Sequence, residues 1–169
     1  MFTPTITSKD LLEGDKLFYR GNGVFGWIIR IYEALLARDW KHLFIAFTHT
    51  AQMVYNRELD LIERFDAMEW LKTGFRPIIG KAYVFRWIVP MTGHEAMVWR
   101  NYLLAREWST YDLSGALTGQ ENVFRDYCSE LSTNADTACG KIKPLNKRLR
   151  PQQVYKKYRK NLVFLWVIL

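Results

Sequence analysis

Apolar and polar residues alternate through the middle of the chain with the two-residue period of a β-strand. Residues 44–55 show this period, and His49 shares one face of the expected strand with every second residue. Residues 59–65 repeat it after the short turn 56–58, which predicts an antiparallel hairpin. Three further stretches are expected to form strands: 16–20, 81–89 and 162–169.

Three other stretches have apolar residues every three or four positions, which is typical of amphipathic helices. They cover residues 24–38, 93–108 and 127–139. In the first helix the apolar stripe consists of Trp27, Ile28, Ile31, Tyr32 and Leu35. Thr92 and Glu95 form a capping-box pattern before the second helix. For the third, Asp126 is the expected N-cap and Gly140 the expected stop.

These elements predict an α+β fold, with an antiparallel sheet packed against helices in a single domain over residues 1–169. The chain is long enough for a real core, and its 49% hydrophobic and 15% aromatic content argues against disorder. The first twenty residues contain no signal-peptide pattern, and no apolar run approaches the length of a membrane span. A cytoplasmic or virion-associated location is therefore expected.

The formal net charge of +7 is concentrated near the C-terminus. Residues 141–169 hold nine Lys or Arg and no Asp or Glu, and all nine cations lie within the basic segment 141–160. The rest of the chain holds 15 basic and 17 acidic residues. The segment is expected to meet an anionic polymer or a membrane surface, or to be a solvated flank; nucleic acid is not favoured.

The two cysteines, Cys128 and Cys139, lie on or beside one expected helix and are too far apart to form a disulfide. No His or Cys cluster has the spacing of a zinc site, so neither a metal nor another cofactor is expected. Cys128 lies in the first turn of its helix, where the helix dipole favours the thiolate. Such sites lower the pKa of a cysteine from about 8.5 to roughly 3.5–7.5. A buried structural thiol is the alternative.

A cysteine nucleophile needs a base, and the base needs a group that orients its ring. The sequence offers Cys128 as nucleophile, His49 as general base and acid, and Glu63 as orienting carboxylate. A three-residue hairpin loop would pair Ala51 with Glu63, which makes Glu63 a diagonal neighbour of His49. The alternatives are a hydrogen-bonded core histidine and a Glu63 paired with Arg64 at the surface.

Several motifs resemble the circularly permuted NlpC-type papain-like cysteine amidases and peptidases, the YiiX-like group. The resemblance runs from about Leu11 to Tyr155. It rests on residues 12–18, 48–55 and 61–65, on Tyr111-Asp112 with 126–131, and on Arg150-Pro151. It implies a cysteine helix that follows the histidine strand, with Cys128 as nucleophile and His49 as base. The third position of the family varies in type, so the resemblance does not fix Glu63.

The function expected from this resemblance is hydrolysis of an amide bond through an acyl-enzyme, with peptidoglycan peptides as the favoured substrate. Thr50 and Gln52 stand where the family often has small apolar residues, which leaves the substrate open. One alternative is an acyltransferase or thioesterase acting on lipid acyl groups. Another is a catalytically idle structural or binding domain of a larger assembly, such as a phage particle.

Overall fold

One antiparallel sheet organises the chain, and the computed structural model describes residues 10–21, 23–68, 71–78, 81–113, 125–145 and 148–168. Within them, six strands follow the order β4-β3-β2-β1-β5-β8, and each neighbouring pair is antiparallel. Their bounds are β1 Lys16–Tyr19, β2 His49–Asn56, β3 Leu61–Asp66, β4 Gly74–Arg76, β5 Ala82–Trp87 and β8 Leu162–Ile168. The predicted α+β fold is confirmed, and β4 is a strand that the sequence pattern did not predict.

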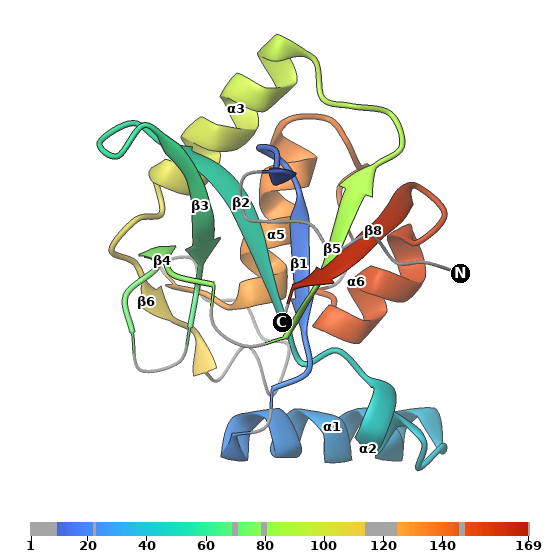
Figure 1. Cartoon of the computed structure of the whole chain (residues 1–169). Helices are drawn as coiled ribbons and strands as arrows, with labels where there is room; N and C mark the ends of the chain where they lie inside the picture. Colours follow the sequence, from blue (N-terminus) through green and yellow to red (C-terminus); the bar gives the residue numbers. More distant parts are fainter. Residues whose placement is uncertain are drawn as a thin grey trace.

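Helices lie behind the sheet and at its two ends (Figure 1). The helices α5 and α6 lie behind it in this view, whereas α3 and the pair α1–α2 lie at opposite ends. Their bounds are α1 Val24–Ala37, α2 His42–Ile45, α3 Gly93–Leu104, α5 Cys128–Ala138 and α6 Pro151–Tyr158. Two short parallel strands, β6 Thr110–Tyr111 and β7 Arg125–Asp126, precede α5.

The cysteine helix α5 packs against β2 and α3. An apolar cluster joins these elements, and its members include Val54 on β2, Trp99 on α3 and Leu131 on α5. All three are at most 1% exposed, so their burial contributes roughly 1.5–3 kcal/mol per aliphatic side chain. This packing fixes α5 against the sheet.

A buried ion pair adds a second connection between the sheet and α5. The ammonium of Lys16, on the central strand β1, lies 2.7 Å from Asp136 on α5, and both side chains are at most 2% exposed. Lys16 also donates to Gln52 and Ser132, each at 3.2 Å, and the indole N–H of Trp99 donates to Asp136 at 3.2 Å. Both charges are therefore hydrogen-bonded, which a buried pair requires.

The β2–β3 hairpin has a different register from the predicted one. The turn covers four residues, 57–60, and Asp60 adopts a positive φ of 53° that Asp tolerates better than most residues. As a result Glu63 pairs with Val54 rather than with Ala51, a shift of three residues. Continuing this register places Asp66 opposite Ala51, the position predicted for Glu63.

The helix α1 forms as predicted, but its apolar stripe faces away from the domain. Trp27, Ile31 and Leu35 are 44%, 45% and 56% exposed, although an amphipathic helix ordinarily buries such a stripe. The buried positions are instead Gly26, Arg30, Glu33 and Ala34. The carboxylate of Glu33 forms an ion pair with Arg150 at 2.7 Å, which holds the polar side of α1 against the domain.

The Lys16–Asp136 pair yields a stability prediction. We expect Lys16→Met to lower the free energy of unfolding by about 3–5 kcal/mol, because it leaves the Asp136 carboxylate buried without its cation. The double variant Lys16→Met/Asp136→Leu should recover much of this loss, since it removes both charges. Urea denaturation followed by circular dichroism measures both values. Equal losses in the single and double variants would contradict the prediction.

Candidate active site

Cys128 is the first residue of α5, and Tyr127 is the N-cap. The prediction that Asp126 caps this helix is wrong by one residue, and the Tyr127 side chain makes no capping hydrogen bond. The helix ends at Ala138, and Gly140 follows it with a φ of +80°, which confirms the expected stop. Cys128 is 3% exposed and lies at the positive end of the helix dipole, where a thiolate is stabilised.

His49 is the first residue of β2, and its ring lies between a carboxylate and the cysteine sulfur. Its Nε2 is 2.7 Å and 2.8 Å from the two carboxylate oxygens of Asp66, the last residue of β3. The Cys128 side chain is close enough to the ring to raise the pKa of His49. The structure thus brings together Cys128 and His49, which are 79 positions apart in the sequence.

The surroundings of His49 favour its charged form. Burial of the ring acts to lower its pKa, but the negative charges of Asp66 and Cys128 and the hydrogen bonds to both side chains outweigh it. The net effect is a pKa of His49 well above its usual value of 6.5. The surroundings of the ring therefore favour an imidazolium next to the candidate nucleophile.

Glu63 does not contact His49 in this structure, which corrects the third member of the predicted site. It pairs with Val54, five positions along β2 from His49, or roughly 16 Å at the rise of a strand. Its carboxylate instead accepts a hydrogen bond from the Asn56 side chain at 2.6 Å. The carboxylate beside the His49 ring is instead that of Asp66, which the sequence did not indicate because the hairpin turn is one residue longer than expected.

Two side chains surround the Asp66–His49 pair. The guanidinium of Arg64 is 3.4 Å from the carboxylate of Asp66, and Asp66 itself is fully buried. Arg64 also lies 5.5 Å from the ring centre of Tyr19, and the Tyr19 ring packs edge-on against His49. Burial, as the largest effect, raises the pKa of Tyr19 to about 12, so its phenol stays neutral at physiological pH. Arg64 therefore places a positive charge beside the Asp66 carboxylate.

The pocket beside the thiol is narrow. It has a volume of about 10 Å³, which is room for roughly one water molecule. Its described lining comprises Cys128 and its neighbour Tyr127 together with Ile29, Thr48, Tyr111, Arg150 and Pro151.

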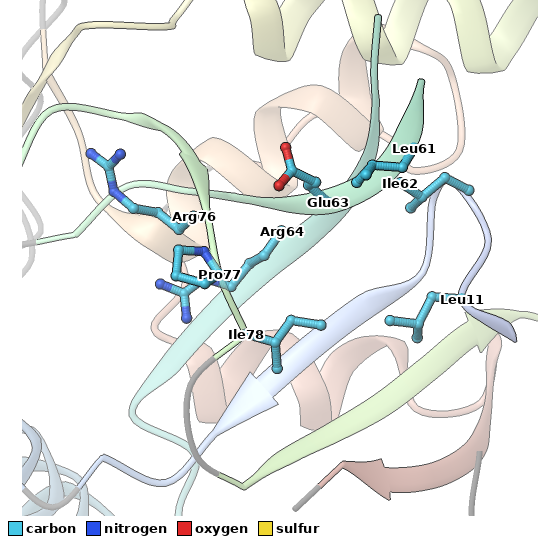
Figure 2. Close-up of a pocket in the computed structure, with 8 residues that line it drawn as sticks. All are labelled: Leu11, Leu61, Ile62, Glu63, Arg64, Arg76, Pro77 and Ile78. Carbon is cyan, nitrogen blue, oxygen red and sulfur yellow. The ribbon is translucent and has the colours of Figure 1, made fainter. Parts of the chain in front are cut away.

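A larger cleft lies over β3 and the segment that follows β4, as Figure 2 shows. Its volume is about 680 Å³, and Arg64 is one of its lining residues. The other lining residues are Leu11, Leu61, Ile62, Glu63, Arg76, Pro77 and Ile78. The cleft does not include Cys128 or His49 in its described lining, so Glu63 belongs to a separate surface.

Comparison with known proteins gives a likeness of fold. No family model matches the chain, and no curated protein matches it. Among solved structures it is similar to the metalloprotein YiiX from Escherichia coli O157:H7, described as DUF1105. The TM-score is 0.57 and the identity 16%, over 93% of this chain and 87% of that one. The chain therefore has a YiiX-like fold, and at this identity the similarity extends no further than the fold.

That neighbour is called a metalloprotein, so the fit of a metal to this chain matters. Among the described residues, no group of three or more His, Cys, Asp and Glu side chains is placed to hold an ion. In the candidate site, the Asp66 carboxylate is hydrogen-bonded to the ring of His49. The described residues therefore do not fit a metal ion.

The pKa of His49 leads to a prediction about thiol labelling. We expect iodoacetamide to label Cys128 faster than Cys139, whose pKa is raised by burial. In Asp66→Asn, loss of the carboxylate charge lowers the pKa of His49, so the imidazolium stabilises the thiolate less. The profile of labelling rate against pH should then shift toward higher pH. Mass spectrometry of labelled peptides across pH measures this shift.

Glu63→Gln is the matched control, because it removes a carboxylate from the same strand without touching His49. Its labelling profile should coincide with that of the unaltered chain. A shift in Glu63→Gln with none in Asp66→Asn would contradict the assignment of Asp66.

Proposed function

We propose that the protein is a cysteine hydrolase that cleaves an amide bond through an acyl-enzyme. The observation that supports this most directly is the position of the His49 ring between Asp66 and Cys128, at the N-terminus of α5. A nucleophile, a base and an orienting carboxylate in this order are the arrangement that acyl transfer requires. The YiiX-like fold is compatible with the proposal.

In the first half-reaction, the Cys128 thiolate attacks the carbonyl carbon of the substrate, and a C–S bond forms. The His49 imidazolium gives its proton to the departing amine nitrogen, and the C–N bond breaks. In the second half-reaction, neutral His49 takes a proton from water, whose oxygen attacks the thioester. The carboxylic acid then leaves, and Cys128 and His49 return to their charged forms.

The start of α5 also supplies groups that stabilise the negative oxygen of the tetrahedral intermediate. The first backbone N–H groups of a helix have no partner within the helix, and Tyr127 makes no side-chain cap. The N–H groups of Cys128 and Ser129 are our candidates for an oxyanion hole. Removing one such donor in other enzymes costs about 10²–10³ in rate.

The sequence resemblance bears on the substrate, and the narrow pocket bears on the alternative of an idle domain. Peptidoglycan peptides are the substrate proposed from the sequence resemblance, while a thioester or lipid acyl group would undergo the same two half-reactions. The narrow pocket at Cys128 is what a catalytically idle domain would show, so the idle alternative has a specific observation in its favour. Accessibility of the thiol separates these cases.

Activity measurements test the proposal directly. We expect the purified protein to release amine from wall peptides or to hydrolyse an acyl thioester, and Cys128→Ala to form no acyl-enzyme detectable by intact-protein mass. His49→Ala should lower kcat by about 10²–10⁴, because it removes the general acid and base.

Matched controls are available for both residues. His94 is exposed and Cys139 follows the end of α5 that is far from Cys128, so His94→Ala and Cys139→Ser should retain full activity. If no substrate of either class is turned over, and Cys128 is labelled no faster than Cys139, the idle domain is the better description.

A further inference from the structure

The outer side of α1 and α2 is unusually apolar for an exposed surface. We define the α1–α2 apolar face by Trp27, Ile31, Leu35, Trp40 and Phe44, which are between 44% and 69% exposed among the described residues. They recur at helical spacing on α1 and continue through the turn into α2, which packs beside it. Figure 1 shows both helices together at one end of the domain. Contiguous exposed apolar faces mark interaction sites.

The outward direction of this face is fixed by the contacts on the other side of α1. Glu33 is 4% exposed and forms an ion pair with Arg150 at 2.7 Å, while Ala34 is 2% exposed. Rotating α1 to bury the apolar stripe would break the buried Glu33–Arg150 pair, which costs several kcal/mol. The domain thus holds the apolar stripe outward.

The composition of the face and its rim indicates what covers it. Trp27 and Trp40 are amphipathic aromatics of the kind enriched at membrane–water interfaces. Exposed cations border the face in the α1–α2 turn, namely Arg38 and Lys41, and Lys157 of α6 is exposed as well. The neighbouring Lys156 contacts His42 of α2 at 2.9 Å, which places the basic end of α6 beside α2.

The acidic residue next to the face, Asp39, makes contacts within the protein. Asp39, in the α1–α2 turn, accepts a hydrogen bond from the backbone N–H of Lys41 at 3.0 Å and lies 3.5 Å from His42. A symmetric contact with a second copy would gather the Arg38 and Lys41 cations of both copies at one interface, which disfavours self-association. An anionic surface complements the same rim.

We propose that the α1–α2 apolar face docks on the surface of an anionic lipid bilayer, with its aromatic and aliphatic side chains in the headgroup region and its cations against lipid phosphates. No helix in the described part of the chain is long and apolar enough to cross a bilayer, and docking in the plane of the surface needs none. This inference does not depend on the proposed cysteine chemistry. It would place the Cys128 pocket, which Ile29 of α1 lines, near the bilayer.

Sedimentation with vesicles tests the docking. We expect the full chain to pellet with phosphatidylcholine vesicles that contain phosphatidylglycerol, more weakly at high salt, and poorly with phosphatidylcholine alone. Ile31→Ser/Phe44→Ser should lower the partition coefficient by about tenfold or more, since it removes two apolar anchors. Lys41→Gln should lower it about fivefold, at low salt only.

The matched control is Leu59→Ser/Val89→Ser, which removes two exposed apolar side chains outside the face and should leave vesicle binding unchanged. Thermal unfolding by circular dichroism should show unchanged midpoints for all these variants, because every altered side chain is exposed. Vesicle binding that survives Ile31→Ser/Phe44→Ser would overturn the proposal. The proposal would also be overturned if light scattering detected a dimer that binds no vesicles, and if Ile31→Ser/Phe44→Ser converted this dimer to a monomer.

Discussion

The buried contact between Lys16 and Asp136 is the constraint on which the arrangement of this protein depends. It joins the central strand of the sheet to the helix that begins with the cysteine, and both charges are almost completely removed from water. Burial, as the largest effect, raises the pKa of Asp136, while Lys16 opposes it. If the helix slid along the sheet, one of the two charges would stay buried without its partner, which is energetically costly. The position of the sulfur relative to β2 is thereby set from the far end of α5.

Ion pairs also surround the thiol, and each pairs a cation of the C-terminal segment with a carboxylate of another part of the chain. Arg148 pairs with Glu130 on α5 and lies 3.7 Å from Asp112, and Arg150 pairs with Glu33 on α1. Part of the basic C-terminal segment therefore neutralises carboxylates inside the protein. Its remaining exposed cations, such as Lys157, are the ones that can meet an external anion. The net charge of the chain alone would overstate the number of cations that are free to meet an external anion.

Sequence periodicity was sufficient for most elements, and it failed where a turn or a tertiary contact decided the outcome. The strand that carries His49 and the helix that carries Cys128 follow from local patterns, and the family resemblance paired the two residues. The identity of the orienting carboxylate did not follow, because a positive φ at Asp60 lengthens the hairpin turn and moves Asp66 into the place expected for Glu63. Periodicity also could not predict the orientation of α1, because an apolar residue every three or four positions does not show whether that stripe faces the core or the solvent. The distant Glu33–Arg150 contact decides that.

Arg150 links the two unusual features of the surface, the closed pocket and the outward apolar helix. It lines the pocket at Cys128, it pairs with Glu33 of α1, and its guanidinium lies 4.8 Å from the ring centre of Tyr32. Ile29 of the same helix lines that pocket as well. The position of α1 and the width of the entrance to the thiol are therefore set by shared contacts. A displacement of α1, for example on adsorption to a surface, would therefore also displace Ile29 and Arg150 in the lining of the cysteine pocket.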